Sequence, residues 1–560
     1  MGDWHVKIWA HLYMVKTVIK HFQTATKYRQ QSILEAAGVI AVVYLLSAVL
    51  GFVRNRVLSG YFGDSTELGL YFAADDIPNL TFTLIISGAL SAAFIPIFNR
   101  FKNKDEENAW ILTSNIINVS IVLFIIVAGL VFSFSDVLVS GVIARNSNLT
   151  PQDMAVFVAL LRILMLSQLG FIVSAFMTSV LQSYNQFMIP AMAPVFLNIG
   201  VILTTVFFYQ SLGIYAPAWG TVVGSILHLL VQIPSVKDLG YRYKLIFDLK
   251  DEGLRQIYRL MLPRTLGQTA QKLIVPLYTN LALSISGASN AIFTFADDLQ
   301  GLPVRIFGMS IGQAALPMFA AAYKDDDPKD FRILVTKTLS QVLFFVLPAS
   351  VIVFILRVPL VRLSVGAKIY SWEATVMTAY TLSFFSFALV SQALILILSR
   401  AFYALSNTRT PFKISMVCML LNAALAILFV SYLGLGVWSL ALASSIATIL
   451  NAILLFVALA KRLDGFDLYG ILHKFNRICF SSLLMGVMLY VPMKIFDNFV
   501  FDTTKTIDLI MLTGFVSAIG ITTYVLLVKF FKLSELDYSY ILFDGIKYFR
   551  WKKFKTNNET

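Results

Sequence analysis

The 560-residue sequence has little cysteine and few charged residues. Neither of its two cysteines, Cys418 and Cys479, has a second cysteine or a histidine at metal-ligand spacing, so both are interpreted as packing residues. The five histidines form no pair at helical spacing around a carboxylate base, and no Walker loop or G-x-S-x-G motif occurs. We therefore expect no metal site, no cofactor, no ATP hydrolysis and no catalytic residues.

The scarcity of charge reflects long apolar stretches. Hydrophobic residues make up 58% of the chain and charged residues 13%, whereas soluble domains average about 45–50% and about 25%. Runs such as 116–134, 338–356 and 414–432 approach the length of about 20 residues that crosses a bilayer. The composition predicts an all-α polytopic membrane protein, and the net charge of +13 is interpreted as a topology signal rather than as nucleic-acid binding.

The pattern of apolar runs predicts about fourteen transmembrane helices. They begin near Ile33, Leu68, Ala109, Met154, Met188, Ala216, Tyr258, Ala291, Ile333, Ala374, Pro411, Val437, Asn476 and Ile507. Lysine and arginine gather in the loops after even-numbered spans and in the C-terminal tail, whereas the loops 211–215, 284–290 and 433–436 carry no charge. Positive residues stay on the cytoplasmic side, so both termini are predicted to be cytoplasmic.

A few cations fall on the outer side of this topology and need another reason to be there. They are Arg54, Arg56, Arg357, Arg362 and Lys368.

An internal repeat relates the two halves of the chain. Ala74-Asp75-Asp76 recurs 222 residues later as Ala296-Asp297-Asp298, the segment 92–98 recurs at 314–319, and Asn198 matches Asn422. Near-constant offsets predict two pseudo-symmetric six-helix lobes around a central cavity, with two extra C-terminal helices. Substrate sites of such transporters lie between the lobes.

The predicted organisation has six parts. They are a basic segment (1–32) that is either an interfacial helix or a tail without defined structure, an N-terminal lobe (33–235), a cytoplasmic linker (236–257), a C-terminal lobe (258–462), spans 13 and 14 (463–532) and a basic cytoplasmic tail (533–560).

Several spaced motifs carry a resemblance to a known family. They are LLSAVLGFVRNRVLSGYFG (45–63), YFAADDIPNL (71–80), GALSAAFIPIF (88–98), TFADDLQGLPVRIFGMSIGQAALP (294–317) and FYALSNTRTPFKI (402–414). This succession resembles the MurJ/MviN family of lipid II flippases, in the MOP transporter superfamily. The resemblance implies a fourteen-helix transporter with a central cavity in the bacterial cytoplasmic membrane. It also implies a function, the movement of undecaprenyl-diphosphate-linked peptidoglycan precursor from the inner to the outer leaflet for cell-wall synthesis.

The chain departs from the family pattern at most of the charged cavity positions. The family's arginines fall at Ala48, Phe82 and Asp298, and two of its acids fall at Gly69 and Ser87. The residues that carry over are Arg54 and the acid at Asp297.

Three cations are the candidates for contact with the substrate diphosphate: Arg54, Lys272 and Arg305. The guanidinium of Arg54 suits two phosphoryl oxygens, and its alternative role is to snorkel to the lipid interface with Arg56. Lys272 and Arg305 lie within predicted spans, where charges usually face a cavity; their alternative role is an ion pair that locks the bundle. Arg305 follows Asp298 by seven residues, close to two helical turns, so we expect both to project from one face.

The repeated acidic pairs are expected to divide their roles, because neighbours on a helix diverge by about 100°. Asp75 and Asp297 are predicted to face the cavity and to pair with its cations when substrate is absent. Asp76 and Asp298 are predicted to hold neighbouring helices or to cap backbone groups near bends. The alternative is that all four acids brace helix packing.

Other functions stay open at this level. The missing arginines also fit another MOP-type carrier, either an oligosaccharide-lipid flippase or a MATE-like cation-coupled exporter. We expect a lipid-linked glycan and membrane lipids as partners, a coupling ion or the membrane potential as driving force, no nucleic acid, and a monomer.

Overall fold

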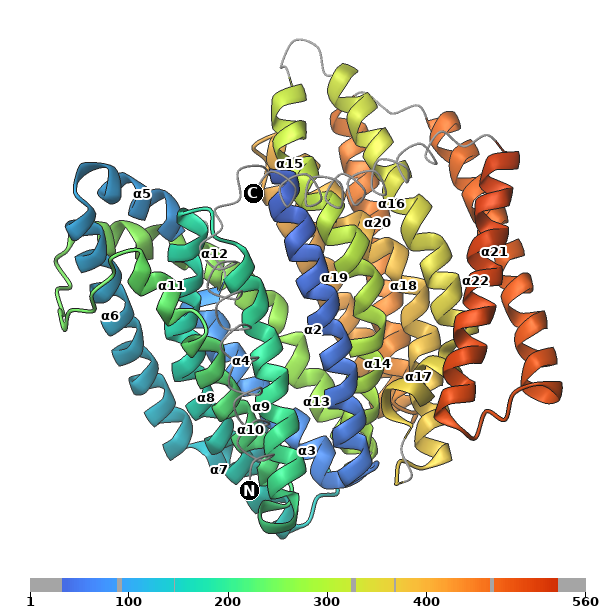
Figure 1. Cartoon of the computed structure of the whole chain (residues 1–560), viewed down its shortest axis with the longest axis horizontal. Helices are drawn as coiled ribbons and strands as arrows, with labels where there is room; N and C mark the ends of the chain where they lie inside the picture. Colours follow the sequence, from blue (N-terminus) through green and yellow to red (C-terminus); the bar gives the residue numbers. More distant parts are fainter. Residues whose placement is uncertain are drawn as a thin grey trace, which may run out of the picture. The chain divides into compact units, whose positions relative to one another are not determined.

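A computed structural model describes residues 33–87, 93–145, 147–323, 329–366, 369–463 and 468–531. This part of the chain consists of helices and connecting turns without any β-strand (Figure 1), which confirms the predicted all-α class. The predicted interfacial segment 1–32 and basic tail 533–560 lie outside the described residues.

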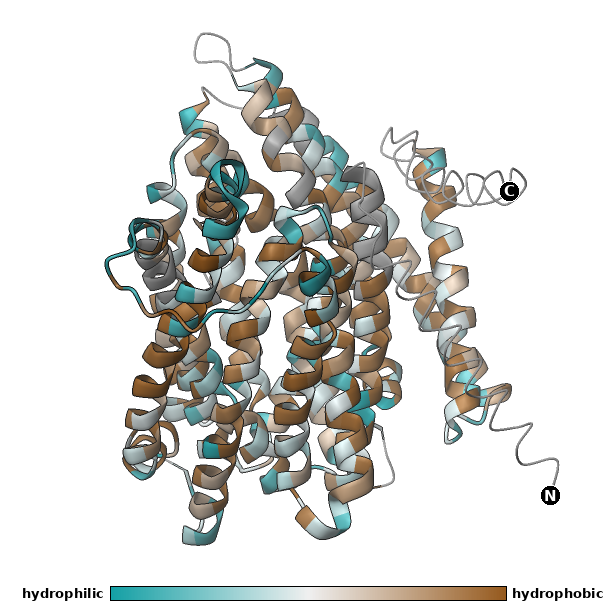
Figure 2. Cartoon of the chain, turned by 60° about the vertical axis from the view of Figure 1, so that its left-hand side comes forward, coloured by the Kyte–Doolittle hydropathy of each residue, from teal (hydrophilic) through white to brown (hydrophobic). Residues whose placement is uncertain are grey.

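Ten segments in this part of the chain are long and apolar enough to cross a membrane. They are α6 (Glu106–Ser133), α8 (Pro151–Ser183), α9 (Met188–Leu212), α10 with α11 (Tyr215–Leu230 and Ile233–Asp238), α16 (Lys329–Ile355), α18 (Trp372–Ala404), α19 with η5 (Arg409–Ile427 and Leu428–Tyr432), α20 (Trp438–Arg462), α21 (Leu468–Phe499) and α22 (Thr506–Phe530). Hydrophobic residues cover most of their length, and hydrophilic residues gather near helix ends and in loops (Figure 2).

The other four predicted spans correspond to one long helix and three interrupted helices. Span 1 is α2 (Ile33–Phe62); span 2 is α3 (Thr66–Ala74), α4 (Asp76–Phe82), η1 (Thr83–Ser87) and α5 (Ile95–Lys104); span 7 is α12 (Glu252–Lys272) and α13 (Ile274–Ile285); span 8 is α14 (Ser289–Pro303), η4 (Val304–Met309) and α15 (Ser310–Ala322). Three short helices, α7 (Ser135–Leu138), η3 (Val139–Ile143) and α17 (Arg357–Val365), lie between spans.

Most of the helices begin within four residues of the predicted positions. The exceptions are α12, which begins at Glu252 rather than near Tyr258, and α21, which begins at Leu468 rather than near Asn476. Both extra segments carry polar and basic residues at the end that we predict to be cytoplasmic. Hydropathy marks only the apolar part of a helix that continues beyond the lipid.

Spans 2 and 8 share a helical irregularity at equivalent positions of the repeat. η1 and η4 are π-helical turns, and subtracting the repeat offset of 222 from the residues of η4 gives 82–87, which overlaps η1. Pro303 ends α14 directly before η4, and proline has no N–H to continue the helical hydrogen bonds. A change of helix type therefore follows directly after a proline in span 8.

The described residues form two compact units. The first comprises residues 33–54, 74–138 and 157–273, and the second comprises residues 55–73, 139–156 and 274–531. The lobe boundaries predicted from the sequence remain a prediction.

Within the first unit, α9 and α10 pack backbone against backbone. A Cβ atom added at Gly200 would lie 2.5 Å from the Cα atom of Gly224, and one at Gly220 would lie 2.8 Å from the Cα atom of Val201. Small residues allow such close approach, which supplies much of the packing energy between helices in lipid. These glycines explain why α9 and α10 pack so closely against each other.

The linker segment 239–251, also in the first unit, runs along α6 without regular structure. The Asn115 side chain donates to the carbonyl oxygen of Asp248 at 2.8 Å and accepts from its N–H at 2.9 Å. Asn118 donates to the carbonyl oxygen of Ile246 at 2.8 Å. Buried polar groups need such partners, so the asparagines in this apolar helix are explained by the linker that they hold.

In the second unit, α16, α21 and α22 share an apolar core. Its buried members include Leu347, Met485, Leu489 and Val516. The buried Tyr524 hydroxyl donates to the carbonyl oxygen of Phe344 at 2.7 Å, which joins α22 to α16. Spans 13 and 14 are therefore packed parts of this unit.

Arg56 and Arg362 join several segments of the second unit. Arg56 donates to the carbonyl oxygens of Arg362 and Leu363, at 3.0 and 3.1 Å, and to the Thr506 hydroxyl at 3.0 Å. Arg362 donates to the carbonyl oxygen of Thr503. The last carbonyls of a helix lack partners inside it, so Arg56 satisfies the end of α17 and ties it to α2 and α22.

Arg357 has a local partner as well. It donates to the carbonyl oxygen of Phe354 at 2.8 Å and lies over the ring of that residue. Lys368 lies outside the described residues. Capping and helix contacts thus give Arg56, Arg357 and Arg362 a structural reason to stand on the predicted outer side.

Candidate functional site

The first polar cluster surrounds Asp75, in the first unit. Span 2 breaks at this residue, between α3 and α4, and the carboxylate is half-buried. Asn79 donates to its Oδ2 atom at 2.6 Å, and the charges of Arg54 and Lys272 act on it electrostatically. The structure therefore brings together one predicted acid and two predicted cations.

Lys272 is fixed to the π-helical turn of span 2. It is the last residue of α12, and its ammonium donates to the Thr83 hydroxyl at 3.0 Å. Thr83 is buried, begins η1, and donates in turn to the carbonyl oxygen of Asn79 at 2.8 Å. The Lys272 residue as a whole remains exposed.

The second polar cluster surrounds Asp297, in the second unit. Its exposed carboxylate accepts from the side-chain amide of Gln300 at 2.9 Å. The buried Gln300 accepts in turn from Gln392 of α18 at 3.1 Å. This chain of amides orients the carboxylate and ties α14 to α18.

Asp298, the neighbouring acid, contacts a different helix. Its Oδ2 atom accepts from the side-chain amide of Asn55, near the end of α2, at 3.0 Å. Asn55 is only 3% exposed, so this hydrogen bond satisfies a polar group inside the packed unit.

Arg305 lies back along its own helix. Its guanidinium donates to the carbonyl oxygens of Gly301 at 3.3 Å and Asp298 at 3.2 Å. A Cβ atom at position 301 would lie 2.6 Å from Nη2, so the glycine makes room for this arrangement. The seven-residue spacing predicted that Arg305 and Asp298 project from one face; this stays a prediction, and the observed contact of the arginine is with the Asp298 backbone. The exposed guanidinium has five N–H donors, and these bonds use only two of them.

The remaining predicted residues hold helices together or begin one. Asp76 lies half-buried in the first turn of α4. Asn198 of α9 donates to the carbonyl oxygen of Ser47 in α2 at 3.3 Å. Asn422 of α19 accepts from the hydroxyl of Tyr278 in α13. The two repeat-related asparagines thus each bond to another helix of their own unit.

Two positions that depart from the family pattern have structural contacts of their own. The ring of Phe82, where the family places an arginine, packs edge-on against Phe171 with the centroids 6.5 Å apart. A Cβ atom at Gly69, where the family places an acid, would lie 1.9 Å from the carbonyl oxygen of Gly287. The chain has no room for an acidic side chain there.

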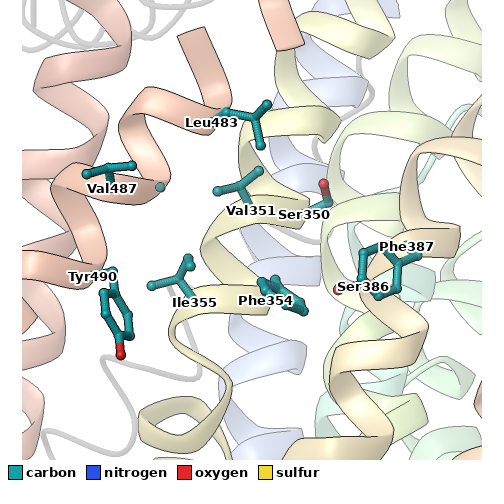
Figure 3. A pocket seen from close by; sticks show the side chains of 10 residues that line it. Ser350, Val351, Phe354, Ile355, Ser386, Phe387, Leu483, Val487 and Tyr490 are labelled. Atoms are coloured by element: carbon teal, nitrogen blue, oxygen red, sulfur yellow. The ribbon is translucent and has the colours of Figure 1, made fainter. Parts of the chain in front are cut away.

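An apolar cavity of about 520 Å³ lies among α16, α18 and α21. Its lining includes Val351, Phe354, Phe387, Leu483 and Val487, and Figure 3 shows these side chains converging from the neighbouring helices. Such a lining accommodates a hydrocarbon chain and offers little to a charged group.

Sequence reasoning missed five polar residues that complete the two clusters: Asn55, Asn79, Thr83, Gln300 and Gln392. The two glutamines carried a usable signal, since an amide within an apolar span needs a partner. Across the residues that the structure describes, no group of three or more histidine, cysteine or acidic side chains could hold a metal ion.

Comparison with known proteins gives consistent matches along the chain. Residues 58–512 match the family model described as "Lipid II flippase MurJ". The "Probable lipid II flippase MurJ" of Buchnera aphidicola is 28% identical over 510 residues, which cover 90% of this chain and 98% of that protein. The "Lipid II flippase MurJ" of Burkholderia cenocepacia is 27% identical over 424 residues, covering 75% and 82% of the two chains.

Solved structures share the fold. One described as "Lipid II flippase MurJ, inward closed conformation" has a TM-score of 0.73 and 24% identity, covering 88% of this chain and 98% of that one. A multidrug MATE transporter of the MOP superfamily has a TM-score of 0.61 and 16% identity, covering 76% and 98%.

Proposed function

Because the chain belongs to the MurJ family of lipid II flippases, we infer that it flips lipid II from the inner to the outer leaflet of the bacterial cytoplasmic membrane. The observation that carries this function is the family match over residues 58–512. The MATE neighbour is similar in fold alone, so a drug-export function has no support of its own.

The chemistry of the polar clusters supports the proposal. A diphosphate with a large polar headgroup cannot cross about 30 Å of hydrocarbon without polar groups to replace water. Arg54, Lys272 and Arg305 are proposed to contact the diphosphate, and Arg54 offers the fork geometry that suits two phosphoryl oxygens. The apolar cavity among α16, α18 and α21 is suited to the hydrocarbon part of such a molecule.

The acids are proposed to act as alternate partners of these cations. A carboxylate repels a diphosphate strongly in a medium of low dielectric constant, so Asp75 and Asp297 do not bind it directly. Asp75 interacts electrostatically with Arg54 and Lys272. In this proposal the acids hold the cations while substrate is absent and release them when substrate arrives.

The test is flipping of lipid II by purified protein in proteoliposomes, together with complementation of a strain depleted of its own lipid II flippase. Wild type is expected to flip and to restore growth. Arg54→Ala is expected to lose flipping while still reaching the membrane, and Arg54→Lys to recover only part, because an ammonium cannot make the bidentate contact. Wild type that moves no lipid II would overturn the function, and full activity in Arg54→Ala would overturn the role of this residue.

Both termini and the loops after even-numbered spans are proposed to be cytoplasmic, on the basis of the lysine and arginine distribution. In a variant without the native cysteines, an impermeant thiol reagent should label Ser211→Cys in intact cells and spare Asn103→Cys; both positions are exposed. Gly287 is unsuitable for this purpose, because its Cβ would lie 2.3 Å from the Thr66 side chain. Labelling of Asn103→Cys alone would show that the topology is the opposite of the proposed one.

The protein is further proposed to work as a monomer, to draw on an ion gradient or the membrane potential, and to be neither an enzyme nor a nucleic-acid-binding protein. A lipid-linked substrate and membrane lipids are its partners in this function.

A further inference from the structure

A chain of side-chain amides ends at the carboxylate of Asp297, and all its members belong to the second unit. Gln392 of α18 donates to the side-chain carbonyl oxygen of Gln300 at 3.1 Å, and Gln300 donates to Oδ1 of Asp297 at 2.9 Å. An ionised carboxylate can only accept, so it sets which end of each amide faces the next residue. Both donors therefore point toward the acid, and the chain stabilises it as a charged acceptor.

The carboxylate of Asp297 keeps acceptor capacity that this chain does not use. A carboxylate has about four lone-pair positions, and within the described residues Gln300 is the donor that bonds to it. Gln300 is 6% exposed, whereas Asp297 is exposed. Because charged groups in membrane spans usually face a cavity, the buried amide holds an acceptor whose other positions are open to a ligand.

The chemistry around this acceptor favours a sugar. A carboxylate repels phosphates but forms short, strong hydrogen bonds with O–H groups. One turn earlier on α14, the half-buried Phe293 packs edge-on against Tyr278 with the centroids 5.4 Å apart. A sugar presents hydroxyls at its rim and C–H groups on its ring face, so an aromatic ring beside an oriented acceptor suits both.

We propose that Asp297 determines specificity for the glycan headgroup, and that its carboxylate accepts hydrogen bonds from sugar hydroxyls beside Phe293. Gln300 and Gln392 are positioning residues in this proposal, because they act through the acid. The proposal rests on the proposed function for the identity of the lipid-linked glycan. It gives the acid a partner in the loaded state, after the cations have been released to the substrate.

Two other residues of α14 provide matched controls. Asp298, the adjacent acid, accepts from the buried Asn55 at 3.0 Å and so serves a contact between helices. Asn290 is a buried amide like Gln300, but it donates to a backbone carbonyl oxygen of α3 at 3.1 Å. Asp298→Asn and Asn290→Leu therefore repeat the chemical changes of Asp297→Asn and Gln300→Met away from the proposed sugar contact.

The experiment measures the affinity of the purified protein in nanodiscs for lipid II, for the same lipid without its peptide and for undecaprenyl diphosphate, with thermal stability followed in parallel. Asp297→Asn should weaken the binding of both glycan lipids about tenfold, because a charge-assisted hydrogen bond becomes a neutral one, without weakening that of undecaprenyl diphosphate. Gln300→Met should weaken it about threefold, since the carboxylate stays but loses its orientation. Both control variants should keep the wild-type ratio of affinities.

The proposal is overturned if Asp297→Asn weakens the binding of all three lipids alike, if Asp298→Asn changes the ratio as Asp297→Asn does, or if Gln300→Met lowers only thermal stability. Weaker binding of lipid II, with the peptide-free lipid unchanged, would assign the carboxylate to the peptide and overturn the sugar contact. In all these outcomes wild type still flips lipid II; wild type that does not would instead overturn the proposed function.

Discussion

The acidic segments of spans 2 and 8 share the sequence Ala-Asp-Asp and differ in structure. In span 2 the helix breaks at Asp75, and the cation beside the following π-helical turn comes from another helix, α12. In span 8, α14 runs unbroken through Asp297 and Asp298, and the cation Arg305 belongs to the turn itself. The shared elements are the acid and the π-helical turn, while the source of the charge differs.

The comparison teaches that a repeat can preserve an arrangement without preserving the residues. When the two halves are aligned, Thr83 stands opposite Arg305, which suggests that the first half lacks a charge there. The hydrogen bond between Lys272 and Thr83 shows that a charge is present at that place. Residue identity at one position is therefore a poor guide to the electrostatics of that position.

The largest expected effect comes from Gly69, a position at which the two halves of the chain differ. The repeat pairs it with Ala291, but at position 69 a Cβ atom would lie 1.9 Å from the carbonyl oxygen of Gly287. Backbone atoms cannot move aside cheaply, so Gly69→Ala should destabilise the protein by about 3 kcal/mol or more. Thermal unfolding in detergent measures the loss. Gly51→Ala, where nothing lies within 4 Å, is the control, and equal stability of the two variants would contradict the close packing.

The next effect separates the two acids of span 8. Asp297→Asn should reduce flipping about fivefold at normal expression, if pairing with a cation contributes about 1 kcal/mol to the transport cycle. The amide of Gln300 can still bond to the remaining carbonyl oxygen, so folding should be preserved. Flipping assays normalised to folded protein check this. A variant that is scarce in the membrane but flips normally per molecule would show that the acid only braces the helices.

The smallest effect on the flipping rate concerns Asp298. Asp298→Ala removes the acceptor of the buried Asn55 amide, and leaving such a group without this bond costs about 1–3 kcal/mol. The amount of folded protein should fall, while the flipping rate of each molecule stays near wild type. Asp298→Asn keeps an oxygen for Asn55 and should recover most of the stability. A flipping defect in both variants at normal stability would move Asp298 into the transport mechanism.

The sequence predicts much of the architecture, because helices that cross a membrane need long apolar segments, and these are visible in the local composition. Apolar runs locate the spans. The repeat relates spans 2 and 8, whose π-helical turns lie at overlapping positions. These features depend on neighbouring residues or on a comparison of the chain with itself.

The candidate clusters are harder to predict, because their partners are distant along the chain. Asn55 and Asp298 are 243 residues apart, and Lys272 and Thr83 are 189 apart. Which turn of one helix meets which turn of another depends on packing in three dimensions, and a single sequence does not reveal it. The same holds for Gly69, whose role is visible only when the Gly287 carbonyl lies against it.

The asparagines of α6 hold the linker by its backbone, and this has a consequence for protein engineering. Asn115 and Asn118 bond to peptide groups, while the side chains of Leu245 and Phe247 remain exposed. Those two positions can be exchanged for a fluorophore or a crosslinker with little disturbance. Inserting one residue before Asp248 would instead shift the hydrogen bonds between the linker and α6 by one position. The side-chain amide of an asparagine would then be left without a partner in an apolar helix. At positions 245 and 247 the loop has to preserve its length rather than its composition.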